Sequence, residues 1–197
     1  MAAPAPTPLP RRPVLTTGRV GVILFLVTEV MLFAGLVTAF LVLKGRAAVW
    51  PPPGQPRLPV AATAVNTIVL LLSGAAMLRA LGESRRIGGK TATWLAAAAG
   101  LGLAFLGGQG IEWIRLLSFG FTTGSGVYGS TFYLVVGMHA AHVFAAVLAL
   151  ATIWSLAWAG RITPAHREPV VIVAFLWLFV VLVWPILYLL LYQPWAR

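Results

Sequence analysis

The chain has 197 residues, of which 60% are hydrophobic and only 9% are charged, whereas a soluble domain is about 25% charged. This composition excludes a soluble globular protein. Cysteine is absent, which excludes disulfide scaffolds, thiolate metal sites and cysteine nucleophiles. Because the composition is so apolar, we assign the net charge of +10 to loops at a membrane surface and not to nucleic-acid binding.

Five long apolar runs dominate the sequence, and a membrane-spanning helix needs roughly 20 apolar residues. They predict an all-α integral membrane protein, a bundle of five transmembrane helices with short loops. Residues 1–18 are rich in Ala and Pro and predict a disordered tail, while residues 19–197 form a single transmembrane domain. The expected helices cover residues 20–43, 58–81, 93–117, 127–159 and 170–192.

The distribution of Lys and Arg predicts the orientation of these helices. Nine of the fourteen basic residues lie in the N-terminal segment and in the second and fourth loops, and five lie on the opposite side. Basic residues accumulate in cytoplasmic loops. We therefore expect a cytoplasmic N-terminus and a C-terminus outside.

Three ionisable residues fall near the middle of the predicted spans, where an ionisable group costs several kcal/mol or more and needs a reason. Glu29 lies about 14 Å into the first helix, and His139 and His142 reach similar depths in the fourth. The two histidines are spaced i, i+3 and share a helix face, so Glu29 is expected to meet either imidazole. The cluster is either a proton-handling or metal site, or a hydrogen-bonded group that joins two helices. The structural alternative is favoured, since a metal requires three or more ligands.

Three further polar residues lie within the predicted spans. Asn66 in the second helix must find a protein partner, because lipid offers none; we group it with the buried cluster. Glu112 and Arg115 are spaced i, i+3 near the end of the third helix, which predicts an interfacial ion pair.

Several motifs resemble subunit III of cytochrome c oxidase and related haem-copper terminal oxidases, and the resemblance extends from about Arg19 to Tyr192. The first helix carries a glutamate within GVILFLVTEVMLF, and a Trp-Pro-Pro loop precedes an Asn-Thr helix. A Glu-Trp pair lies near the end of the third helix, and the fourth contains GMHAAHV. The matching runs are residues 21–33, 50–52, 66–71, 112–113, 127–133 and 137–143.

The resemblance implies the short five-helix bacterial form of subunit III, located in the inner membrane. Glu29 then takes the place of the family's membrane-buried glutamate. Such a subunit has no catalytic residues and binds no haem or copper itself; both belong to the catalytic subunit I against which it packs. The resemblance also implies bound phospholipid and a supporting role in proton uptake and in the stability of the complex.

Two departures and two alternatives accompany this interpretation, and the first departure is the expected lack of the two extra N-terminal helices of seven-helix members. The family's last helix has a His and an Asp where this chain has Leu178 and Val181, so the polar contacts of those residues are missing. One alternative is the related accessory membrane protein of nitric oxide reductases. The other is a small proton-coupled transporter that uses Glu29 as its relay.

Overall fold

The computed structural model describes residues 16–56 and 58–192. Most of the predicted tail, residues 1–18, lies outside the described residues, but the first helix already begins at Thr17, so Thr17 and Gly18 are helical and not part of a tail. The helices are α1 (Thr17–Arg46), α2 (Val60–Glu83), α3 (Thr91–Ser118), α4 (Gly126–Trp158) and α5 (Glu168–Tyr192), with a short 3₁₀ turn η1 (Pro164–His166) before α5.

All five helices are long and apolar enough to cross a membrane. Their outward faces carry large apolar side chains, among them Met31 at 69% exposure and Leu182 at 65%, as expected for surfaces that contact lipid. Within the described residues, the prediction of an all-α protein with five helices of membrane-spanning length and composition is confirmed.

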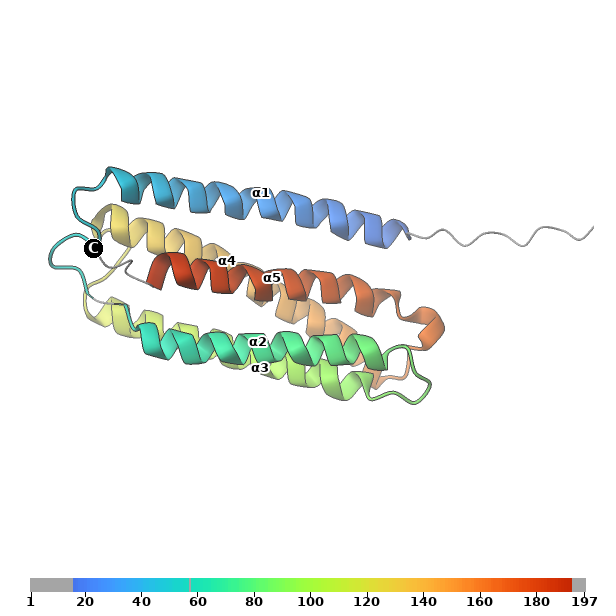
Figure 1. Ribbon diagram of the computed structural model, residues 1–197. Coiled ribbons are helices and arrows are strands. Elements are labelled where there is room, and N and C mark those ends of the chain that lie inside the picture. Colours follow the sequence, from blue (N-terminus) through green and yellow to red (C-terminus); the bar gives the residue numbers. More distant parts are fainter. Residues whose placement is uncertain (1–15, 57, 193–197) are drawn as a thin grey trace, which may run out of the picture.

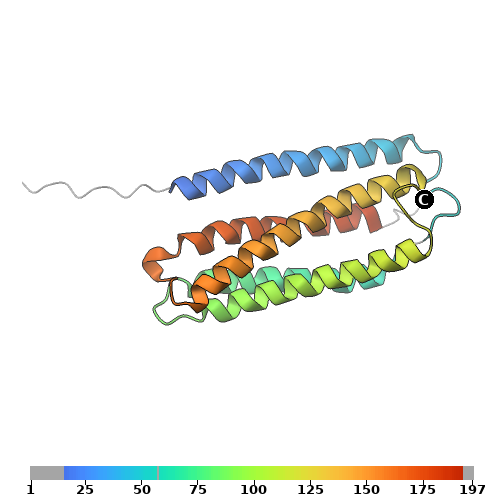
Figure 2. The same cartoon turned by 180° about the vertical axis from the view of Figure 1, so that it is seen from behind.

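The helices form three layers (Figures 1 and 2). α1 lies along one side, α4 and α5 occupy the middle, and α2 and α3 pair on the far side. α4 crosses the bundle obliquely, so that its first turns lie near the end of α1 and its last turns near the beginning of α3 (Figure 2). This arrangement separates α1 from α2 and gives α1 its main contacts with α5 and α4.

Hydrogen bonds between helices join α2, α3 and α5 in the interior of the bundle. Ser73 of α2 donates its hydroxyl to the carbonyl of Ala98 in α3, at 2.6 Å. The same hydroxyl oxygen accepts the indole N–H of Trp177 in α5, at 3.1 Å. One side chain thus links three helices at a depth where lipid supplies no alternative partner.

A second set of hydrogen bonds joins the same three helices at positions seven residues from Ser73, Ala98 and Trp177. Asn66 of α2 donates its amide to the carbonyl of Phe105 in α3, at 3.0 Å. Beside it, Trp184 of α5 donates its indole N–H to the hydroxyl of Thr67, at 2.9 Å. Seven residues are two turns of a helix, so the repeated spacing keeps these polar groups on the faces that meet.

Glycines allow the bulky side chains of α5 to approach α2 and α3. A Cβ atom added at Gly102 of α3 would overlap the ring of Trp177, and one at Gly74 of α2 would lie 2.9 Å from Val181. Val181 stands where the resemblance implies an acid. Here its side chain is 3% exposed and packs against Gly74, so an apolar contact occupies that place.

Near its two ends α1 is attached by contacts of different kinds. Arg19 donates from Nε and Nη2 to the two carboxylate oxygens of Glu168 at the start of α5, at 2.9 and 2.7 Å, a bidentate geometry that is among the stronger ion pairs. Towards the other end, Phe40 packs edge-on against Trp50 of the following loop, which packs in turn against Tyr128 of α4. Only two residues of α1 are fully buried, so these contacts and one near its middle position the helix.

We expect Gly102→Ala to lower the thermal midpoint of unfolding, because the added methyl group collides with the Trp177 ring. Overpacking of this kind costs about 1–3 kcal/mol. The matched control is Gly100→Ala on the same helix, where the new Cβ meets nothing within 4 Å and helix propensity favours Ala by up to about 1 kcal/mol. Equal midpoints for the two purified variants would contradict the close packing of Trp177 on α3.

Candidate functional site

A hydrogen bond between α1 and α4 lies near the middle of both helices. The Oε2 atom of Glu29 is 2.7 Å from Nε2 of His142, and the two side chains are 12% and 19% exposed. Phe33, one turn along α1, packs its ring edge-on against His142 at a centroid distance of 5.2 Å. The pair is therefore mostly shielded by its own helices and lies where an ionisable group is costly.

The second ring nitrogen of His142 determines how many protons the pair holds. Nδ1 lies 2.7 Å from the carbonyl oxygen of Met138, and because a carbonyl only accepts, Nδ1 must carry a hydrogen. Nε2 then either accepts a proton from a carboxylic acid or donates one to a carboxylate. In both arrangements one proton lies between His142 and Glu29, and the pair has no net charge.

His139 forms no hydrogen bond with Glu29, although it lies only one turn from His142. Its ring is fully buried, stacks on Trp184 at a centroid distance of 4.9 Å and meets Phe33 and Phe105 edge-on. Neither ring nitrogen has a hydrogen-bond partner among the described residues. Residues spaced i, i+3 differ by about 60° around a helix, which is enough to bring His142 to Glu29 of α1 and to place His139 between Phe33 of α1, Phe105 of α3 and Trp184 of α5.

Asn66 lies apart from Glu29, since α2 and α1 are on opposite sides of the bundle (Figure 1). Its amide bonds to the carbonyl of Phe105, and a Cβ atom at Gly108 would lie 2.7 Å from its Oδ1. The residue thus fits closely against α3 and joins two helices there.

Glu112 belongs to a second buried polar cluster, which the sequence interpretation did not identify. Its Oε2 accepts hydrogen bonds from Thr63 of α2 at 2.9 Å and from Gln109 of α3 at 3.1 Å. Gln109 also donates to the hydroxyl of Tyr192 in α5, at 3.1 Å. Gln109 carries a sequence signal, because it is a polar residue inside an apolar helix at i−3 from Glu112.

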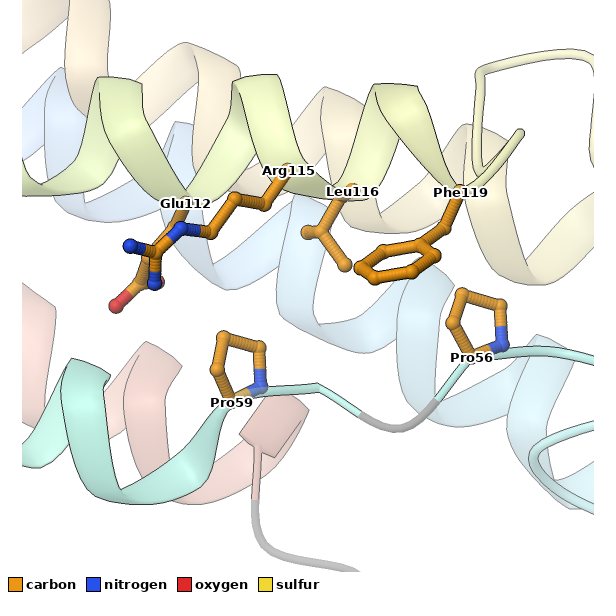
Figure 3. Close-up of a pocket in the computed structure, with 6 residues that line it drawn as sticks. All are labelled: Pro56, Pro59, Glu112, Arg115, Leu116 and Phe119. Carbon is orange, nitrogen blue, oxygen red and sulfur yellow. The ribbon is translucent and has the colours of Figure 1, made fainter.

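Arg115 does not form the predicted ion pair with Glu112. The three ion pairs found among the described residues involve other side chains, and the carboxyl group of Glu112 is directed into the bundle by its bonds to Thr63 and Gln109. Arg115 is exposed on α3 and lines a pocket at the end of that helix (Figure 3).

Within residues 16–56 and 58–192, no group of three His, Cys, Asp or Glu side chains is placed to hold a metal ion. The arrangement around Glu29 and His142 can hold and transfer one proton between an oxygen and a nitrogen, and it joins α1 to α4.

The comparisons with known proteins all indicate the same family. The family model for cytochrome c oxidase subunit III matches residues 11–197. Cytochrome c oxidase subunit 3 of Corynebacterium diphtheriae is 33% identical, covering 98% of this chain and 94% of that protein. The Synechocystis protein of the same name is 34% identical over 87% of this chain and 73% of its own length, and that of Marchantia polymorpha is 37% identical over 88% and 67%. The chain therefore belongs to the cytochrome c oxidase subunit III family.

Proposed function

We propose that this chain is the non-catalytic subunit III of a haem-copper cytochrome c oxidase, in which it packs against the catalytic subunit. Membership of the family carries this proposal. The arrangement of side chains supports it, because buried polar groups such as those of Asn66, Ser73 and Glu112 bond to neighbouring helices and so hold the bundle together. Haem and copper then reside in the partner subunits.

The proposal includes a location and an orientation: a bacterial inner membrane, with the N-terminus in the cytoplasm and the C-terminus outside. The excess of Lys and Arg in the N-terminal segment and in the second and fourth loops supports this orientation. The loop containing Gly88 and the loop containing Gly54 lie at opposite ends of the bundle (Figure 1), so they provide two test positions.

The Glu29–His142 pair is the part of the chain that we connect with proton uptake and with the durability of the complex. It is a proton-bearing group near mid-membrane with no net charge. Its first role is to fix α1 to α4, a link that water cannot replace at this depth.

The function is tested by purifying the tagged chain from its native membrane in mild detergent. We expect haem absorbance in the purified complex, with the catalytic subunit present in fixed ratio, and a colourless preparation when the chain is expressed alone. Stoichiometric haem bound to the isolated chain would contradict a non-catalytic role. A colourless chain that purifies without oxidase subunits and moves protons in vesicles would instead favour a transporter.

The orientation is tested with reporter domains inserted at Gly54 and at Gly88. A reporter active only outside should be active at Gly54, and one active only in the cytoplasm should be active at Gly88. The opposite result at both positions would mean that the bundle is inserted the other way round.

Substitutions at Glu29 test the hydrogen-bonded pair. Glu29→Gln keeps an uncharged side chain whose amide can donate to Nε2 of His142, so the complex should assemble and retain its thermal midpoint. Glu29→Ala leaves His142 without its partner and should cost about 1–3 kcal/mol, measured as a lower midpoint and loss of the chain from the purified complex. A Gln variant that assembles as poorly as the Ala variant would show that the ionisable carboxyl group itself is required.

A further inference from the structure

The two carboxyl oxygens of Glu112 have different surroundings. Oε2 accepts hydrogen bonds from the hydroxyl of Thr63 at 2.9 Å and from the amide of Gln109 at 3.1 Å. Oε1 is not bonded to a described residue, and it is not among the buried atoms that are shut off from solvent without a partner. Glu112 also lines the open pocket of about 290 Å³ at the end of α3 (Figure 3). One oxygen is thus held inside the bundle, and the other is available to the pocket.

This bonding pattern is that of a neutral carboxylic acid. Such an acid has one carbonyl oxygen, which only accepts, and one hydroxyl oxygen, which carries the proton. Oε2, with its two donors, matches the carbonyl oxygen, so the proton belongs on Oε1. Glu112 is only 5% exposed, and burial disfavours a carboxylate. The ion pairs found among the described residues do not include Glu112.

Two other titratable or charged side chains face the Glu112 cluster. Arg115, on the same helix, lines the same pocket and is exposed. Tyr192 of α5 accepts a hydrogen bond from the Gln109 amide at 3.1 Å, while α2 contributes the hydroxyl of Thr63. The guanidinium group favours a carboxylate, but water around an exposed charge weakens this attraction. Arg115 therefore attracts water to the pocket without cancelling the cost of a buried charge.

The depth of Glu112 allows contact with water. It lies six residues before the end of α3, which is about 9 Å along the helix axis. This level is close to the boundary between hydrocarbon and headgroups. The loop that contains Gly88 precedes α3, so the pocket and that loop are at opposite ends of the helix. Water entering the pocket therefore comes from the side of the membrane where α3 ends.

We propose that Glu112 is a proton-exchange site, which is a neutral acid at neutral pH and exchanges its proton with water in the pocket. On protonation, an O–H bond of a hydronium ion breaks, an O–H bond forms at Oε1, and a water molecule remains; deprotonation is the reverse. Thr63 and Gln109 are positioning residues that hold Oε2 in both forms. The site is separate from the Glu29–His142 pair, and the inference does not depend on the proposed oxidase function.

Infrared spectroscopy tests the proposal on the full chain, purified with the subunits it retains. At neutral pH we expect a protonated-carboxyl C=O stretch that is lost in Glu112→Gln, whose amide oxygen can still accept from Thr63 and Gln109. The matched control, Glu29→Gln, removes a different buried carboxyl group and should keep this band. Glu112→Asp retains an acid and should change the frequency of the band, so the assignment holds even if Glu112→Gln fails to assemble.

Transfer into D₂O tests access to the pocket. The Glu112 band should shift to lower frequency while the protein remains folded, because deuterium replaces the proton on Oε1. Absence of a Glu112-dependent C=O band at neutral pH would overturn the neutral acid. A band that shifts only after unfolding would overturn exchange through the pocket.

A substitution at the mouth of the pocket tests the setting of the charge. Arg115→Gln should let the C=O band persist to higher pH, because the lost positive charge had favoured the carboxylate. Arg46→Gln is the matched control, since Arg46 ends α1 at the same end of the bundle and does not line the pocket; it should leave the pH dependence unchanged. Equal pH dependence in the two variants would contradict the placement of the acid at this pocket.

Discussion

The hydrogen bonds from α2 side chains to its neighbours are the interactions on which the bundle depends. Apolar helix surfaces gain little by leaving lipid for one another, so packing and polar contacts must supply the attraction. Ser73 and Asn66 both donate to backbone carbonyls of α3, and Trp177 and Trp184 of α5 bond to hydroxyls of α2. Two fully buried indoles are thereby accommodated, because each N–H has an acceptor.

The number and approximate extent of the membrane spans could be predicted from the sequence, because span length follows directly from bilayer thickness. Contacts between helices could not be predicted in the same way. Glu112 shows why: its spacing from Arg115 favours an intrahelical ion pair, whereas its carboxyl group is bonded to Thr63, which is 49 residues away in the chain. Gln109 had a readable signal, but its link to Tyr192 requires knowing that α3 and α5 meet.

The depth of each candidate residue in the membrane could be predicted from the sequence, but its neighbours around the helix could not. Counting residues brings Glu29, His139, His142 and Asn66 to similar levels, and depth alone therefore groups all four. Which of them meet depends on the order of the helices in the bundle, which one sequence does not contain. α4 and α5 lie between α1 and α2 (Figure 1), which keeps Asn66 away from Glu29. Asn66 bonds to α3 instead, and of the two histidines only His142 is hydrogen-bonded to Glu29.

The absence of net charge on the Glu29–His142 pair has a consequence for an energised membrane. A full charge crossing the bilayer changes energy by about 2.3 kcal/mol per 100 mV. The proton shared by this pair moves by less than the 2.7 Å between its two heavy atoms, at most roughly a tenth of a hydrocarbon core of about 30 Å. The position of that proton therefore responds to the transmembrane voltage by no more than about 0.2 kcal/mol per 100 mV, and the bond between α1 and α4 keeps its strength whether the membrane is polarised or not.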